Sequence, residues 1–221
     1  MTTSLKSAAP LLIAACLALA GCATTQPVPY GGLASSGQLR PNLNDPSGRI
    51  PYNYATQVNL RDYKSIIIDP VVVYRGQDSQ FEEVTEEDKA ELAAYMQSEF
   101  EARLRGRFDL TRDPGRHTLR LKLTLTGAKS NTRFLSTASR FDLAGGPYNL
   151  VQAARGKEGA FTGSVMYAVE LYDASTNLLV NAYVTKQYPG PYNLGASLGL
   201  MDASKAGIRN GAEALLAQLQ Q

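Results

Sequence analysis

Leucine occupies every second position from Leu119 to Leu125, and a charged residue or a threonine stands at each position between. Strict alternation of apolar and polar side chains predicts a β-strand with one buried face. Residues 165–171 and 178–184 alternate in a similar way on either side of a turn-forming segment, Asp173–Asn177. This pattern predicts a hairpin. A chain with such strands must form a sheet and needs other elements to cover its apolar face.

Two segments have the spacing of amphipathic helices. The first begins at Thr85-Glu86-Glu87-Asp88, which has the form of a capping box. Its apolar residues follow at helical spacing: Leu92, Ala93, Met96, Phe100 and Leu104. The second segment closes the chain with Ile208, Ala212, Leu215, Leu216 and Leu219. Gly207 and Gly211 form a GxxxG pattern there, which outside a membrane segment predicts close packing of the helix.

Further strands are predicted before and after the first helix. Residues 65–74 form a β-branched run that Asp69-Pro70 interrupts, and residues 107–112 have the length of a short strand. The order of elements indicates an α+β fold. We expect a mixed or antiparallel sheet of about four to five strands, with two helices packed on one face. A signal peptide and a flexible linker are expected to precede this domain.

The N-terminus has the pattern of an export signal. Lys6 precedes an apolar stretch, 8–20, which is too short to span a bilayer comfortably. This stretch ends in Leu19-Ala20-Gly21-Cys22, which resembles the lipobox of bacterial lipoproteins. The resemblance implies cleavage before Cys22, triacylation of that residue with chains such as palmitate, and a permanent membrane anchor. Some inner-membrane lipoproteins carry Asp directly after the lipidated cysteine, whereas this chain has Ala23. The resemblance to outer-membrane lipoproteins therefore predicts a location on the outer membrane, facing the periplasm.

Two other interpretations of the N-terminus are an ordinary cleaved signal peptide and a buried apolar hairpin of a cytosolic protein. Neither explains the abrupt change to a stretch rich in Pro, Gly, Ser, Thr and Asn over 23–54. We therefore predict a signal peptide over 1–21, a lipid-anchored flexible linker over 22–59 and one α+β domain over 60–221. The linker would let the domain stand off the bilayer. Cys16 lies in the leader, so the mature chain has no free thiol.

The leader and two motifs resemble a known family. Tyr63-Lys64-Ser65-Ile66-Ile67-Ile68-Asp69-Pro70-Val71 and Val169-Glu170-Leu171-Tyr172-Asp173-Ala174-Ser175-Thr176-Asn177 are similar to segments of the proteobacterial lipoproteins called domain-of-unknown-function 3313. The family usually has Gly where this chain has Asn177, which also tolerates the left-handed turn conformation. The resemblance implies a lipid-anchored envelope protein and no particular activity.

An irregular insertion at 129–160 interrupts the strand pattern and supplies most of the candidate partner-binding residues. Its arginines could meet the phosphate or carboxylate groups of an envelope protein, lipid or peptidoglycan. The charge count by itself favours a solvated loop. Gly146-Pro147-Tyr148-Asn149-Leu150 recurs as Gly190-Pro191-Tyr192-Asn193-Leu194, which either reverses the chain twice or places two tyrosines at one rim of the sheet. The candidates are Arg133, Arg140, Tyr148, Arg155 and Tyr192.

The sequence contains little material for catalysis. His117 is the only histidine, and the carboxylates at 82–88 are explained by a helix start. No phosphate-binding loop or cysteine-ligated metal site is present in the sequence, so we expect no cofactor and no metal. The net charge of +2 is too small to indicate nucleic-acid binding.

We expect a non-catalytic envelope lipoprotein that binds or scaffolds another envelope component. The alternatives are a carrier that holds an apolar ligand between sheet and helices for lipid transport and, more weakly supported, a hydrolase that uses carboxylates.

Overall fold

The central strand of the sheet is β7 (Thr118–Lys129) in the computed structural model, which describes residues 25–130, 163–190 and 201–221. On one side, β7 pairs antiparallel with β8 (Ser164–Asp173), and β8 with β9 (Leu179–Gln187). The sheet continues through β2 (Tyr52–Ala55) to β1 (Arg40–Pro41). On its other side, β7 pairs parallel with β3 (Ser65–Ile68), β4 (Val72–Val73) and β5 (Gln80–Glu82). Beyond β3 lies β6 (Asp109–Leu110), also parallel.

The mixed α+β architecture with two helices is as predicted, but the sheet formed by the described residues has nine strands instead of four to five. The additional strands are short. β1, β2 and β5 contain two, four and three residues, so alternation cannot be recognised in them. β2 and β5 form because the long strands β9 and β7 offer them hydrogen-bonding partners, and β1 forms in turn beside β2. These pairings join segments that are distant in sequence, so no local pattern contains them.

The segment predicted as one strand over 65–74 forms two strands, β3 and β4. Both pair with β7. Asp69-Pro70 separates them, and Pro70 has no N–H to donate to a ladder. The Asp69 N–H donates to the carbonyl of Leu121 at 3.0 Å, so pairing with β7 continues up to the proline. The Val71 N–H donates instead to the Gln97 side chain at 2.9 Å.

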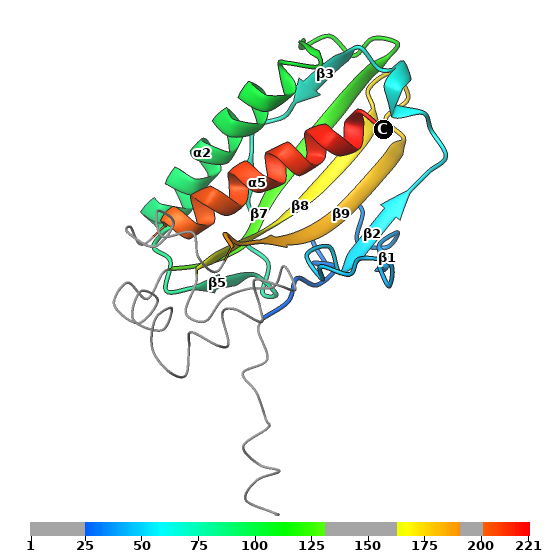
Figure 1. Cartoon of the computed structure of the whole chain (residues 1–221). Coiled ribbons are helices and arrows are strands. Elements are labelled where there is room, and N and C mark those ends of the chain that lie inside the picture. Colours follow the sequence, from blue (N-terminus) through cyan, green and yellow to red (C-terminus); the bar gives the residue numbers. More distant parts are fainter. Residues whose placement is uncertain (1–24, 131–162, 191–200) are drawn as a thin grey trace, which may run out of the picture.

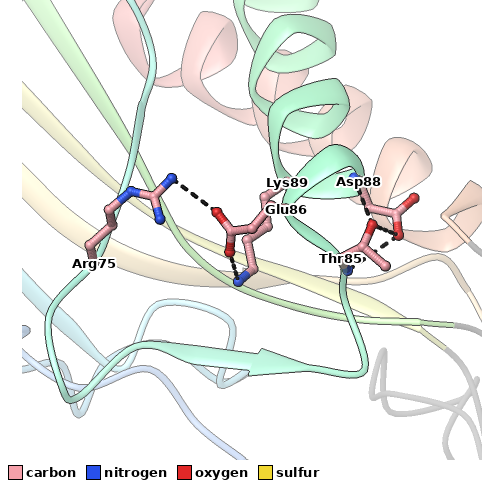
Figure 2. Close-up of polar contacts among 5 residues, drawn as sticks. All are labelled: Arg75, Thr85, Glu86, Asp88 and Lys89. Atoms are coloured by element: carbon pink, nitrogen blue, oxygen red, sulfur yellow. Dashed lines mark hydrogen bonds and ion pairs between the residues drawn. The ribbon is translucent and has the colours of Figure 1, made fainter.

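Both helices, α2 (Glu86–Leu104) and α5 (Asp202–Leu219), cover the same face of the sheet (Figure 1). The predicted capping box begins α2 (Figure 2): Thr85 Oγ1 accepts from the Asp88 N–H at 3.1 Å, and Asp88 Oδ2 accepts from the Thr85 N–H at 3.3 Å. In the same turn, Glu86 pairs with Lys89 at 2.6 Å and with Arg75 at 2.9 Å. Three acidic residues in this first turn also suit the helix dipole.

The main core lies between the helices and the sheet. The leucines at 119, 121, 123 and 125 are 0–1% exposed and face the apolar stripes of both helices, as the alternation predicted. Gly207 and Gly211 let α5 approach closely. A Cβ on Gly207 would lie 2.8 Å from the Gln187 carbonyl oxygen, and one on Gly211 would overlap the Tyr167 hydroxyl.

The other face of the sheet is covered by residues 25–39, which we call the N-terminal strap. Pro27, Tyr30, Leu33, Ser35 and Leu39 are buried, and the strap forms a second apolar cluster with Ala168, Ala182 and Val184. This differs from the flexible linker predicted over 22–59, because β1 and β2 also lie in that range. Proline and glycine prevented long elements there but not packing against the sheet.

The hairpin of β8 and β9 forms as predicted. Asp173 begins its turn and accepts hydrogen bonds from Ser175 and Thr176. Asn177 has φ of 56°, which is the left-handed conformation expected where the family usually has glycine. The turn therefore has the geometry that the family motif implied.

Candidate functional site

The residues predicted as sites lie outside the described part of the chain. They are Cys22, Arg133, Arg140, Tyr148, Arg155 and Tyr192. The residues that flank the two internal stretches are described, however. Lys129 pairs with Ser164, and Val165 pairs with Gln187, so both stretches leave the sheet at one end. The β8–β9 turn forms the opposite end (Figure 1).

The described residues contain a cleft at the free edge of β3, which we call the β3-edge cleft. It has a volume of about 680 Å³. The cleft exists because β6 is shorter than β3: β6 pairs with Ser65 and Ile66 only, whereas β7 pairs with all four residues of β3. Ile67 and Ile68 therefore extend beyond the last pair with β6.

The backbone of β3 determines which groups face the cleft. The Ser65 and Asp69 N–H groups donate toward β7, to His117 and Leu121. The backbone N–H and C=O groups of Ile66 and Ile68 point away from β7. The Ile66 carbonyl, for example, accepts a hydrogen bond from the Thr111 N–H at 3.0 Å. Ile68 comes next on that side, and no residue of β6 pairs with it in the described structure. The cleft thus has a short length of free strand edge on its floor.

Charged and polar side chains surround this edge. Gln97 and Glu101 come from α2, and Thr111 and Arg112 come from the chain after β6. Arg120 Nε lies 3.5 Å from Asp69 Oδ1, and both side chains are about one-third exposed. This separation exceeds that of an ordinary hydrogen bond, and Arg120 Nε is a buried donor with no hydrogen-bond partner among the described residues. The apolar lining comes chiefly from isoleucines 66–68 and Leu110.

A smaller depression of about 380 Å³ surrounds Tyr63, His117 and Asp173, at the end of the sheet where β3 and β7 begin and β8 ends. The Tyr63 hydroxyl donates to Asp173 Oδ2 at 2.9 Å. Burial alone would raise the pKa of Asp173, but hydrogen bonds from Ser175, Thr176 and Tyr63 outweigh it and lower this pKa to about 2. Burial and the bond to Asp173 raise the pKa of Tyr63 to about 12. At neutral pH neither group is ready to exchange a proton.

His117 is exposed and has φ of 60°. Its carbonyl accepts from the N–H groups of Lys64 and Ser65 at 2.9 and 3.3 Å, which joins the start of β7 to the start of β3. The backbone of this residue therefore has a clear structural role in a turn. Within residues 25–130, 163–190 and 201–221, no group of three or more His, Cys, Asp or Glu residues could hold a metal ion. No helix in these ranges has the length and apolarity needed to cross a membrane.

The sequence interpretation missed Glu170, a carboxylate that is only 4% exposed and lies beneath the strap. One of its oxygens accepts from the Ser35 N–H at 2.7 Å. Lys122 is its cross-strand neighbour. A signal was present: Met166 and Ala168 share this face with Glu170, and apolar residues on both faces of one strand indicate cover on both sides.

The family model described as "Protein of unknown function (DUF3313)" matches residues 29–215. No curated protein matches the chain. Among solved structures, a PelC dodecamer of Paraburkholderia phytofirmans is 11% identical, with 76% of this chain and 94% of that chain covered and a TM-score of 0.40.

Two other similar structures come from families named by number. A DUF330 protein of Xanthomonas campestris is 8% identical, with 74% and 88% coverage and a TM-score of 0.37. A DUF4136 protein of Bacteroides thetaiotaomicron is 13% identical, with 76% and 95% coverage and a TM-score of 0.36. Such distant similarities say nothing about activity. The family model spans most of the chain, and the protein therefore belongs to the DUF3313 family, as its strand and hairpin motifs had predicted.

Proposed function

We propose that this protein is a lipid-anchored, non-catalytic lipoprotein of the cell envelope, tethered to the outer membrane through Cys22 and facing the periplasm. Its domain binds or scaffolds another envelope component. The observation that carries the binding part is the β3-edge cleft, where free strand edge, apolar side chains and guanidinium groups converge. The leader and Leu19-Ala20-Gly21-Cys22 support the anchor.

The partner that best fits the cleft is a short extended segment of an envelope protein. A free strand edge binds an extended peptide by adding it as a further strand, and side-chain pockets then select its residues. Pro70 limits the free edge to about one residue pair, so only a short segment can add here. Arg112 and Arg120 would pair with an acidic residue of that segment.

The anchor is tested by the intact mass and N-terminal peptide of the protein purified from bacterial membranes. Wild type should begin at a triacylated Cys22, and the Cys22→Ser variant should lack this modification. An unmodified terminus at Met1 in wild type would refute the anchor.

Binding at the cleft is tested by photo-crosslinking from Thr111, with Ala102 on the exposed side of α2 as the matched control position. We expect an adduct with one envelope protein from Thr111 only, and a weaker adduct after Arg112→Glu. A synthetic peptide of the crosslinked segment should then slow amide hydrogen exchange at Ile68 on the purified domain. Binding without any change in exchange at 66–69 would contradict strand addition.

The carrier alternative would place an apolar ligand between the sheet and the helices. Leu92, Met96, Phe100 and Leu104 are 0% exposed in that layer, and Gly207 and Gly211 bring α5 against the sheet. A ligand there would have to displace packed side chains. No contact of the described residues favours this alternative over peptide binding.

A further inference from the structure

The N-terminal strap is held firmly at its first described residue. The Thr25 hydroxyl donates to Glu82 Oε1 at 3.0 Å, and Lys186 Nζ donates to the Thr25 carbonyl at 3.0 Å. The next residue is also bound, because Gln80 Nε2 donates to the Gln26 carbonyl at 2.9 Å. These contacts join the strap to β5 and β9 at the end of the sheet where β5 lies (Figure 1).

The strap is also held along its length, so it cannot lengthen the tether without disrupting the second apolar cluster. The Tyr30 side chain is 0% exposed, and its hydroxyl donates to Gln80 Oε1 at 2.6 Å. The Gly31 N–H donates to Asp78 at 2.9 Å, and the Gly32 N–H donates to the Tyr74 hydroxyl at 3.0 Å. The strap therefore behaves as part of the domain and not as spacer.

Only three residue steps separate Cys22 from Thr25. Fully extended, three residues reach about 10 Å. We infer that, in the mature lipoprotein, the end of the domain formed by Thr25, Glu82 and Lys129 lies against the phospholipid headgroups. This inference rests on the proposed lipid on Cys22, and it replaces the expectation that a flexible linker lets the domain stand off the bilayer.

The chemistry of this end suits contact with headgroups. Lys129 and Glu82 form an ion pair at 3.2 Å, with side chains 48% and 41% exposed. Thr25 is exposed. Burial alone would raise the pKa of Glu82, but the hydrogen bonds from Thr25 and Lys129, together with the charges of Lys129 and Lys186, lower it. Charges of both signs match zwitterionic headgroups and oppose entry into the hydrocarbon layer. The β8–β9 turn lies at the far end of β8, about 30 Å away for a ten-residue strand.

Depth-dependent fluorescence quenching tests this orientation. A fluorophore is attached to Glu87→Cys near the strap end, or to Leu178→Cys in the β8–β9 turn as the matched distal position. Labelling is specific because Cys16 is removed with the leader and the sulfur of Cys22 carries the lipid, so the mature chain has no other thiol. The lipidated proteins are reconstituted into phosphatidylcholine–phosphatidylglycerol vesicles that contain headgroup nitroxide lipid. We expect quenching several-fold stronger at position 87 than at position 178.

A ten-residue Gly/Ser insertion between Thr24 and Thr25 provides the control, because it adds reach without changing the described fold. The insertion should remove most of the difference between the two positions. Equal quenching at both positions without the insertion, or stronger quenching at position 178, would overturn the inference. Intact mass separates the two proposals: protein without lipid on Cys22 that fails to bind vesicles overturns the anchor and the orientation with it, whereas lipidated protein with equal quenching overturns the orientation alone.

Discussion

The approach of α5 to the sheet depends on single glycine residues. Gly211 faces the Tyr167 hydroxyl, and an added Cβ there would overlap that oxygen. We predict that Gly211→Ala lowers the free energy of unfolding by about 1–3 kcal/mol, because the core must shift to accept the methyl group. Urea denaturation measures this change.

The cost should fall when the clash is removed. Tyr167 is fully buried, and its hydroxyl makes no hydrogen bond within the described residues, so Tyr167→Phe leaves no acceptor or donor unpaired. In the Tyr167→Phe background, Gly211→Ala should cost clearly less than in wild type. Gly37→Ala is the matched control, since no atom lies within 4 Å of an added Cβ there. Additive effects of the two core changes would contradict the contact.

Asp173 makes stability depend on pH. Its pKa is about 2 in the folded protein against an ordinary value of 3.8, so folding favours the charged form. The stabilisation is present above pH 4 and is lost as the pH falls toward 2. We predict that Asp173→Asn is less stable than wild type at pH 6 and that the difference shrinks between pH 4 and 2. Parallel pH profiles of the two urea midpoints would refute this role.

Residues that act through local chemistry could be predicted from sequence, whereas residues that act through distant contacts could not. The turn geometry of Asn177 and the cap at Thr85 follow from neighbours in the chain. Glu170 becomes a buried acceptor only because Ser35, 135 positions away in sequence, lies over it. No local pattern around Ser35 contains this information.

Long secondary-structure elements could be predicted from sequence, whereas short ones could not. The long strands β7, β8 and β9 and both helices have enough residues for their apolar periodicity to be recognised. β2 has four residues and forms because the edge of β9 accepts it, with Tyr52 opposite Val184. A Pro-rich composition correctly excluded long helices before Leu60 but said nothing about packing, so the expected linker is largely part of the domain.

The strap can be tested as an element. Tyr30→Ala should lower the free energy of unfolding by about 3–5 kcal/mol, because it empties the space that the ring occupies against the sheet. It should also make residues 25–39 sensitive to protease under native conditions, ahead of global unfolding. Val28→Ala, at a position 36% exposed, is the control and should change neither property. A flexible linker would instead be cut equally fast in wild type and both variants.

The candidate site is a property of the whole molecule. Sequence reasoning selected charged and repeated residues in two irregular stretches, and those assignments remain predictions. The β3-edge cleft depends on where β6 ends relative to β3 and on how α2 places Gln97 and Glu101 beside that edge. Each of these residues is unremarkable within its own segment. Only the register between segments makes them neighbours.

The whole domain should fold without its anchor. Both apolar clusters lie within residues 25–221, and no buried contact of the described residues calls for lipid. We therefore predict that exchanging residues 1–22 for an ordinary cleavable signal peptide moves the protein from the membrane fraction to the soluble periplasmic fraction, while its urea midpoint matches that of a detergent-free, proteolytically released wild-type domain. Wild-type protein retained in membranes is the control for fractionation. If the variant instead aggregated or unfolded at lower urea, lipid would contribute to folding as well as to location, and the strap would need the membrane to pack.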